Sequence, residues 1–176
     1  MARSDRASEF VEFTREHRDD LVRTAVLLCA GDEALAEDLV QTTLTKLYLA
    51  WAKVRRADRP LAYARAALTN VFVDETRRAH RRRETTVGEL PFLADRREPY
   101  AAAELRAVVL AALAGLGPRQ RAVVVLRHWH DLDVYETARA LGCSVGTVKS
   151  QNARALAHLR RLLGPADDVL SVGGAR

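Results

Sequence analysis

Apolar side chains recur at steps of three and four along much of the chain, which is the spacing of one face of an amphipathic helix. In the N-terminal half this pattern predicts three helices, which span residues 8–30, about 32–51 and about 61–83. Ser8 fits the N-cap of the first helix, and Gly31 fits its end. Pro60 suits the first turn of the third helix, whereas residues 53–59 before it have no regular period.

The periodicity stops at residues 84–99, where Gly88, Pro91 and Pro99 stand among mixed charges. Such a segment is typical of a linker, and about 15 residues can reach about 50 Å when extended. Helical spacing then returns over residues 105–116. The sequence therefore predicts an all-α fold of two small helical domains joined by a flexible linker. We place the first domain at residues 8–83, the linker at 84–99, the second domain at 100–163 and a polar tail at 164–176.

The segment from Val123 to Leu126 is apolar enough to suggest a β-strand. Gly117 and Pro118 precede it and mark the start of a helix, because Pro is favoured in a first helical turn. Helical patterns also flank the segment on both sides. We therefore expect a buried helix here.

The most specific local pattern lies between Asp133 and Leu163 and indicates a helix-turn-helix. Gly142 supplies the turn, Ser144 can cap the second helix, and the small Ala138 allows close packing of the two helices. The second helix would then expose a polar set suited to the DNA major groove. This set consists of Thr147, Lys149, Ser150, Gln151 and Arg154. An ordinary helical hairpin with a charged surface is the alternative.

A run of arginines ends the third predicted helix, at positions 77, 78, 81, 82 and 83. Two interpretations stay open for this run. The cations can bind phosphates of a nucleic acid, or they can form a solvated helix end that the helix dipole favours.

Composition supports a globular protein and permits an anionic partner. The 176 residues are 48% hydrophobic and 29% charged, with a net charge of +5. The sequence contains no apolar run long enough to cross a bilayer and no signal-peptide core. We therefore expect a cytoplasmic protein without membrane insertion. Cys29 and Cys143 are a single distant pair, which suggests neither a disulfide scaffold nor a zinc site.

Catalytic motifs are missing from the sequence. It has no glycine-rich phosphate loop, no nucleophile elbow and no His-Glu-x-x-His helix. The His128-Trp129-His130 segment, with Asp131 and Asp133 nearby, is better explained as a polar loop with Trp129 in the core than as a metal cluster. We therefore expect no enzyme activity, no catalytic residue, no metal and no cofactor.

Taken together, these segments resemble one family over about Phe10 to Leu163, the extracytoplasmic-function (ECF) sigma factors of the sigma-70 family. Residues 36–48 (Ala-Glu-Asp-Leu-Val-Gln-Thr-Thr-Leu-Thr-Lys-Leu-Tyr) are similar to region 2.2 of that family. Residues 70–78 are similar to its Asn-x-x-x-Asp-x-x-Arg-Arg signature of regions 2.3–2.4. Region 4 is matched by residues 116–121 and by the helix-turn-helix, whose Leu-Gly-Cys-Ser-Val-Gly-Thr-Val-Lys-Ser-Gln run resembles a sigma-E-type subgroup.

The resemblance implies a role for each segment in transcription initiation. Asp38 and Gln41 would dock on the clamp helices of the RNA polymerase β′ subunit. The loop at residues 54–59 would receive a flipped base, which can be read on all its edges only when unstacked. The −10 element would contact Tyr63 (commonly Trp in the family), Asn70, Asp74, Arg77, Arg78 and Arg81. The −35 element would contact Ser144, Thr147, Lys149, Ser150, Gln151 and Arg154.

The implied partners are core RNA polymerase, through its β′ clamp helices and β flap, promoter DNA and an anti-sigma factor. Two alternatives from other classes stay open. One is a helix-turn-helix regulator that acts without core polymerase, which would need a dimer interface. The other is a helical interaction protein that has lost DNA binding.

Overall fold

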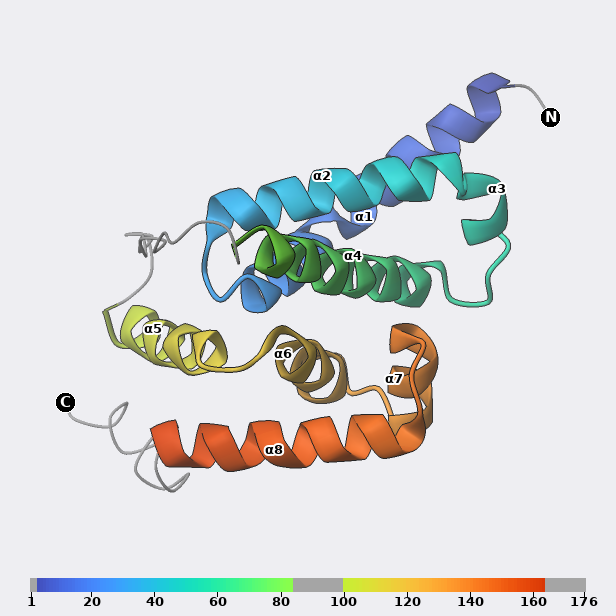
Figure 1. The fold of residues 1–176 in the computed structure, drawn as a ribbon. Helices are drawn as coiled ribbons and strands as arrows, with labels where there is room; N and C mark the ends of the chain where they lie inside the picture. Colours follow the sequence, from blue (N-terminus) through green and yellow to red (C-terminus); the bar gives the residue numbers. More distant parts are fainter. Residues whose placement is uncertain (1–2, 84–99, 164–176) are drawn as a thin grey trace.

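The computed structural model describes residues 3–83 and 100–163, so the predicted linker and tail lie outside the described residues. Every regular element in the described residues is helical (Figure 1). This agrees with the predicted all-α class. The elements are α1 (Arg3–Leu28), α2 (Glu33–Leu49), α3 (Trp51–Val54), α4 (Pro60–Arg83), α5 (Tyr100–Ala114), α6 (Pro118–Val124), the π-helical turn η1 (Val125–Trp129), α7 (Val134–Leu141) and α8 (Val145–Leu163).

The N-terminal module, residues 3–83, is a bundle in which α1, α2 and α4 pack on one another (Figure 1). Each helix contributes an apolar stripe to a shared core, as its spacing predicts. The core side chains include Leu21, Leu28, Val40, Leu47 and Leu68. The short helix α3 was not predicted, and it closes one end of the bundle by burying Trp51 and Val54.

Local signals explain most of the helix boundaries in this module. The Asp32 carboxylate accepts a hydrogen bond from the Leu35 backbone N–H at 2.9 Å and so caps α2. Gly31 before it has a φ of 92°, which glycine adopts without strain. The expected cap at Ser8 is wrong, because α1 begins at Arg3 and Ser8 is an exposed residue inside the helix. Asp5 occupies the first turn instead, where its charge complements the helix dipole.

The C-terminal module, residues 100–163, contains the predicted helix-turn-helix in α7 and α8. Asp133 caps α7 through a capping box with Glu136. Gly142 ends α7 in the left-handed region with a φ of 59°, and Ser144 caps the next helix by accepting the Thr147 N–H at 3.0 Å. Ala138 and Val148 are buried together with Val123, which fixes the angle between the two helices.

The apolar segment of uncertain type, residues 123–126, is helical and buried, as expected. Its continuation η1 is a π-helical turn in which the His130 N–H donates to the Val125 carbonyl, five residues back. The wider turn shifts the phase of the side chains that follow. Trp129 therefore points outward and is 54% exposed, so its predicted place in the core is wrong. His130 is part-buried instead, against α1.

The two modules pack directly against each other (Figure 1). Ala122 of α6 and Val125 of η1 are buried in the core cluster of the N-terminal module. Helix α7 lies against α4, and its Leu141 contacts the same cluster. The contact brings the start of the helix-turn-helix next to the N-terminal half of α4.

Candidate nucleic-acid and partner interfaces

The first three turns of α8 form a polar surface on the C-terminal module, which we call the reading face (Lys149, Ser150 and Arg154). All three residues are exposed. The other predicted members are less free, because Gln151 is half-buried and the Ser144 and Thr147 hydroxyls lie 2.9 Å apart within the cap. The reading face therefore has two cations and one hydroxyl available for an external partner.

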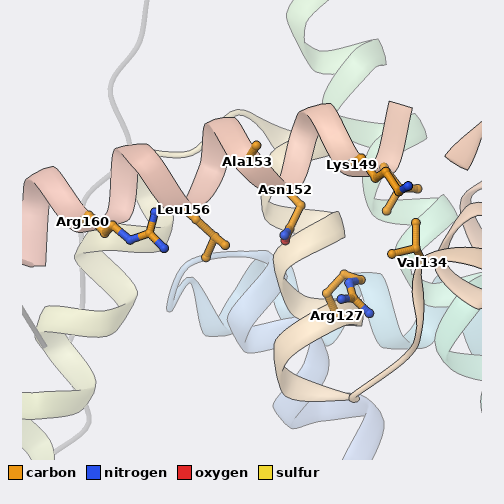
Figure 2. A pocket seen from close by; sticks show the side chains of 8 residues that line it. Arg127, Val134, Lys149, Asn152, Ala153, Leu156 and Arg160 are labelled. Atoms are coloured by element: carbon orange, nitrogen blue, oxygen red, sulfur yellow. The ribbon is translucent and has the colours of Figure 1, made fainter. Parts of the chain in front are cut away.

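An open hollow of about 330 Å³ adjoins this face (Figure 2). Three cations line it: Arg127 from η1, and Lys149 and Arg160 from α8. The residues that line it include no carboxylate, so the hollow is electropositive. The remaining lining residues are Val134, Val148, Asn152, Ala153 and Leu156.

Sequence reasoning did not single out Arg127. Its guanidinium donates to the Leu132 carbonyl, which fixes the loop between η1 and α7. A regular 3.6-residue period cannot place Arg127 correctly, because the π-helical turn changes the phase of the helix at this residue. The only local signal in the sequence is the adjacent pair Arg127 and His128 just before the helix-turn-helix.

The predicted −10 set lies along α4, and its members have different surroundings. The Asn70 side-chain amide donates to the Ala140 carbonyl of α7 at 2.7 Å. Arg77 and Arg78 are exposed, although each forms an ion pair three residues back, with Asp74 at 3.3 Å and Glu75 at 2.7 Å. Surface pairs of this kind are weak, so both arginines can exchange them for phosphates.

Further along α4, Arg81 is exposed, and the side chains of Arg82 and Arg83 lie outside the described residues. At the other end of the helix, the half-buried Tyr63 lies beneath the Lys53 ammonium, whose Nζ is 5.8 Å from the ring centroid. In the preceding loop, Arg59 forms an ion pair with Glu136 of α7 at 3.3 Å. The structure therefore places α7 beside both the loop and Asn70.

Asp38 and Gln41 form a second polar surface, on α2, which we call the docking face. Both residues are exposed, one helical turn apart on the same side. The Gln41 amide donates to Glu37 at 3.1 Å, and Glu37 in turn accepts from Arg18 of α1 at 2.6 Å. Gln41 keeps its side-chain carbonyl oxygen as an acceptor, and Asp38 adds a carboxylate one helical turn away. The docking face is thus rich in acceptors and suits a partner with donors.

Several titratable groups are partly or fully buried where the helices meet. Arg65 donates two hydrogen bonds to Asp20, at 2.9 and 2.7 Å, and thereby lowers the pKa of that carboxyl below its usual 3.8. Burial, with the nearby Arg65 charge, lowers the pKa of His130 from 6.5 to about 4. Burial also raises the pKa of the Cys29 thiol to about 12. These shifts accompany the packing of the helices.

A metal site would need several converging ligands. Within residues 3–83 and 100–163, no group of three His, Cys, Asp or Glu side chains is arranged to hold an ion. In the same described ranges, no helix combines the length and apolar character needed to cross a bilayer.

Comparison with known proteins gives matches over both modules. Residues 13–82 match the family described as Sigma-70 region 2, and residues 106–159 match Sigma-70, region 4. The chain is 40% identical over 161 residues to an RNA polymerase sigma-E factor of Streptomyces coelicolor, covering 90% of this chain and 88% of that one. It is 42% identical over 163 residues to the sigma-E factor of Streptomyces avermitilis, covering 90% and 87%.

More distant matches are consistent with these. The ECF RNA polymerase sigma factor SigM of Mycobacterium tuberculosis is 32% identical over 155 residues, covering 88% of this chain and 77% of that one. Among solved structures, the sigma factor RpoE of Bartonella quintana, in complex with the anti-sigma factor NepR, superposes with a TM-score of 0.70. That match covers 90% of this chain and 98% of the other at 23% identity, and it supports the fold.

Proposed function

The chain belongs to the ECF group of the sigma-70 family, and from that premise we propose which of its surfaces perform transcription initiation. As an RNA polymerase sigma factor, it needs one surface for the polymerase and others for the promoter. The observation that carries the proposal is that the docking face on α2 and the reading face on α8 are both exposed, on different modules of one chain. A stand-alone DNA-binding module would not need the first of these surfaces.

The docking face binds core RNA polymerase at the β′ clamp helices. Its support is chemical: Asp38 and Gln41 present oxygen acceptors, and the Glu37 and Arg18 pair holds the Gln41 amide in one orientation. An oriented acceptor pair binds a basic helix with less loss of side-chain entropy than a freely rotating one. The β flap contacts the C-terminal module, as in the family.

The reading face binds the −35 element in the major groove. Lys149 and Arg154 provide base or phosphate contacts, and the Ser150 hydroxyl, which donates to the Thr147 carbonyl, keeps acceptor capacity. The positive hollow beside it extends the surface toward the DNA backbone through Arg127 and Arg160.

The −10 element binds along α4 and the loop before it. Arg77, Arg78 and Arg81 provide phosphate contacts, and Asp74 positions Arg77 through their ion pair. Tyr63 and Asn70, which follow the loop at residues 54–59 on α4, read a base that has left the stack. Capture of that base drives strand opening, so the protein needs no covalent chemistry of its own and acts as a non-catalytic, cytoplasmic subunit.

An anti-sigma factor is a further proposed partner. The structurally similar RpoE was solved in complex with one, although the likeness at 23% identity concerns the fold. Direct capture with a candidate anti-sigma domain, with and without core polymerase as competitor, tests this part. Binding that polymerase does not displace would contradict it.

Run-off transcription with purified core polymerase, on a fragment from upstream of the chain's own gene, tests the function. We expect a transcript that needs both the chain and the polymerase. The variant Asp38→Ala with Gln41→Ala should lose both polymerase pull-down and transcript, whereas the exposed control Ala157→Ser should keep both. Unchanged pull-down by the double variant would contradict the docking face. A footprint by the free chain as a dimer would favour a regulator that acts without polymerase.

A further inference from the structure

A hydrogen bond joins His128 of η1 to Asn152 of α8, one of the residues that line the electropositive hollow. His128 Nε2 lies 2.9 Å from Asn152 Oδ1. Because an amide oxygen can only accept, His128 donates through Nε2–H, and the neutral ring carries its proton on that nitrogen. The bond therefore fixes which end of the Asn152 amide faces His128.

The nitrogen of the Asn152 amide remains available to a ligand. Its two N–H groups can both donate, and no residue in the described part of the chain accepts from them. Asn152 is half-buried, and Figure 2 shows its side chain pointing from α8 toward η1. A group that enters the hollow can thus accept a hydrogen bond from this amide.

The other polar groups of the hollow are cations. Lys149 and Arg160 belong to α8, and Arg127 belongs to η1, where its guanidinium is anchored by the Leu132 carbonyl. Among the described residues, none of these three cations forms an ion pair. The hollow therefore selects a ligand that has negative charge and hydrogen-bond acceptors.

A phosphate group of DNA has both properties. Its charged oxygens only accept, whereas the edge of a base carries no net charge. The apolar lining residues Val134, Ala153 and Leu156 can pack against the attached deoxyribose. Lys149 belongs both to the hollow and to the reading face, so DNA bound on the reading face has its backbone close to the hollow.

We propose that the hollow binds one phosphate of the −35 element, and that His128 is a positioning residue that orients the Asn152 amide to donate to this phosphate. The proposal rests on the proposed function, in which the C-terminal module binds the −35 element. His128 holds the amide before DNA arrives, so less side-chain entropy is lost on binding. Asn152 lies outside the predicted −35 set and adds a neutral donor beside the cations.

Removal of single phosphate charges from the DNA locates the contact. Each phosphate of the −35 element is replaced in turn by a neutral methylphosphonate, in a fragment from upstream of the chain's own gene. Binding of this fragment by the chain with core polymerase is then measured for the parent and for Asn152→Ala. At one phosphate, the loss of affinity on replacement should be about tenfold smaller for Asn152→Ala, because this variant already lacks the amide contact.

Two variants of Asn152 separate a phosphate contact from a base contact. Asn152→Ala should weaken promoter binding about tenfold, and equally on fragments that differ in −35 sequence. It should leave the slope of log K against log salt unchanged, because asparagine carries no charge. Asn152→Asp places a carboxylate among the three cations, so it should weaken binding further and reduce that slope by about one.

Variants of His128 test its positioning role. His128→Ala frees the Asn152 amide to turn and should weaken promoter binding about threefold. His128→Gln keeps a side-chain N–H that can donate to the amide oxygen, so it should restore most of the affinity. In the Asn152→Ala background, His128→Ala should have no further effect, because His128 acts only through the amide.

A control variant and a stability measurement separate DNA contact from folding. Ala157→Ser changes an exposed residue of α8 that does not line the hollow, and it should bind the promoter as the parent does. Urea denaturation of each His128 and Asn152 variant should give a midpoint close to that of the parent, because their hydrogen bond is exposed.

Three outcomes overturn the phosphate contact: equal affinity of Asn152→Ala and the parent, a loss confined to one base pair, or a scan without a phosphate that couples to Asn152. The last would mean that the hollow takes a free anion such as inorganic phosphate. Additive effects of the two alanine changes would overturn the positioning role of His128. In all these cases the parent still forms a promoter complex and a transcript, whereas a parent that forms neither with core polymerase refutes the proposed function.

Discussion

Acid should weaken the folded chain through His130, and the size of the effect follows from where that side chain lies. The Thr24 hydroxyl donates to the Asp20 carbonyl at 2.7 Å, so His130, whose Nε2 lies 2.9 Å from the hydroxyl oxygen, donates to Thr24. His130 also faces Asp20 and Arg65, and burial together with the Arg65 charge disfavours its cationic form. Its pKa in the folded protein is about 4, against 6.5 for an unperturbed histidine. The unfolded chain therefore takes up this proton at a higher pH than the folded chain does.

The sign and the window follow from proton linkage. The free energy of unfolding should fall as the pH drops from about 6.5 to about 4, and it should level off below that range. One pKa unit corresponds to about 1.4 kcal/mol, so the loss by pH 5 should be about 2 kcal/mol. Asp20 acts in a separate range, because its lowered pKa places the loss of its contribution below pH 3.8.

Urea denaturation followed by far-ultraviolet circular dichroism, at half-unit steps from pH 7.5 to 4.5, measures this loss. His130→Gln keeps a donor for Thr24 but cannot titrate, so its free energy of unfolding should change much less over the same range. His80→Gln, at an exposed position on α4, serves as the control and should follow the parent. A parent curve that is flat between pH 7 and 5, or a slope that survives in His130→Gln, would refute the reasoning.

Three further changes have defined outcomes. Gly142→Ala places a side chain at a φ of 59° where nothing lies within 4 Å of its Cβ, so the cost is the backbone strain of about 1 kcal/mol, seen as a lower urea midpoint. Asp133→Ala removes the cap of α7 and should cost about 1 kcal/mol in the same assay, whereas Asp133→Asn should restore most of it. If Arg154 makes a bidentate contact to a base, Arg154→Ala should cost about 1–3 kcal/mol of binding free energy at one −35 position. If it contacts a phosphate, the variant should weaken binding to all promoters equally and reduce the slope of log K against log salt by about one.

Local chemistry made the helices predictable. Asp32 before α2 has a carboxylate that can cap a helix, and Gly142 after α7 has no side chain to oppose a left-handed backbone. Both helix boundaries are therefore visible in the sequence. The start of α1 was misplaced because Ser8 is a favourable cap only where the chain before it is not helical. The helix α3 was missed since four residues are too few to show a period.

The contacts between the modules lay beyond sequence reasoning. Nothing local links Thr24 to His130 or Asn70 to Ala140, because these contacts join residues far apart in the chain and depend on how two finished modules pack. The π-helical turn had the same effect on a smaller scale. Because the turn changes the phase of the helix, Trp129 is exposed although burial was expected. For the same reason, no pattern of constant period predicts the position of Arg127.

By exposing Trp129, the π-helical turn also leaves the protein with two tryptophans in different surroundings. The chain has two tryptophans, and they lie in different modules. Trp51 is 3% exposed inside the N-terminal bundle, whereas Trp129 is 54% exposed on the C-terminal module. Iodide should quench the second indole and spare the first, so the fluorescence of unlabelled protein can follow the melting of each half separately.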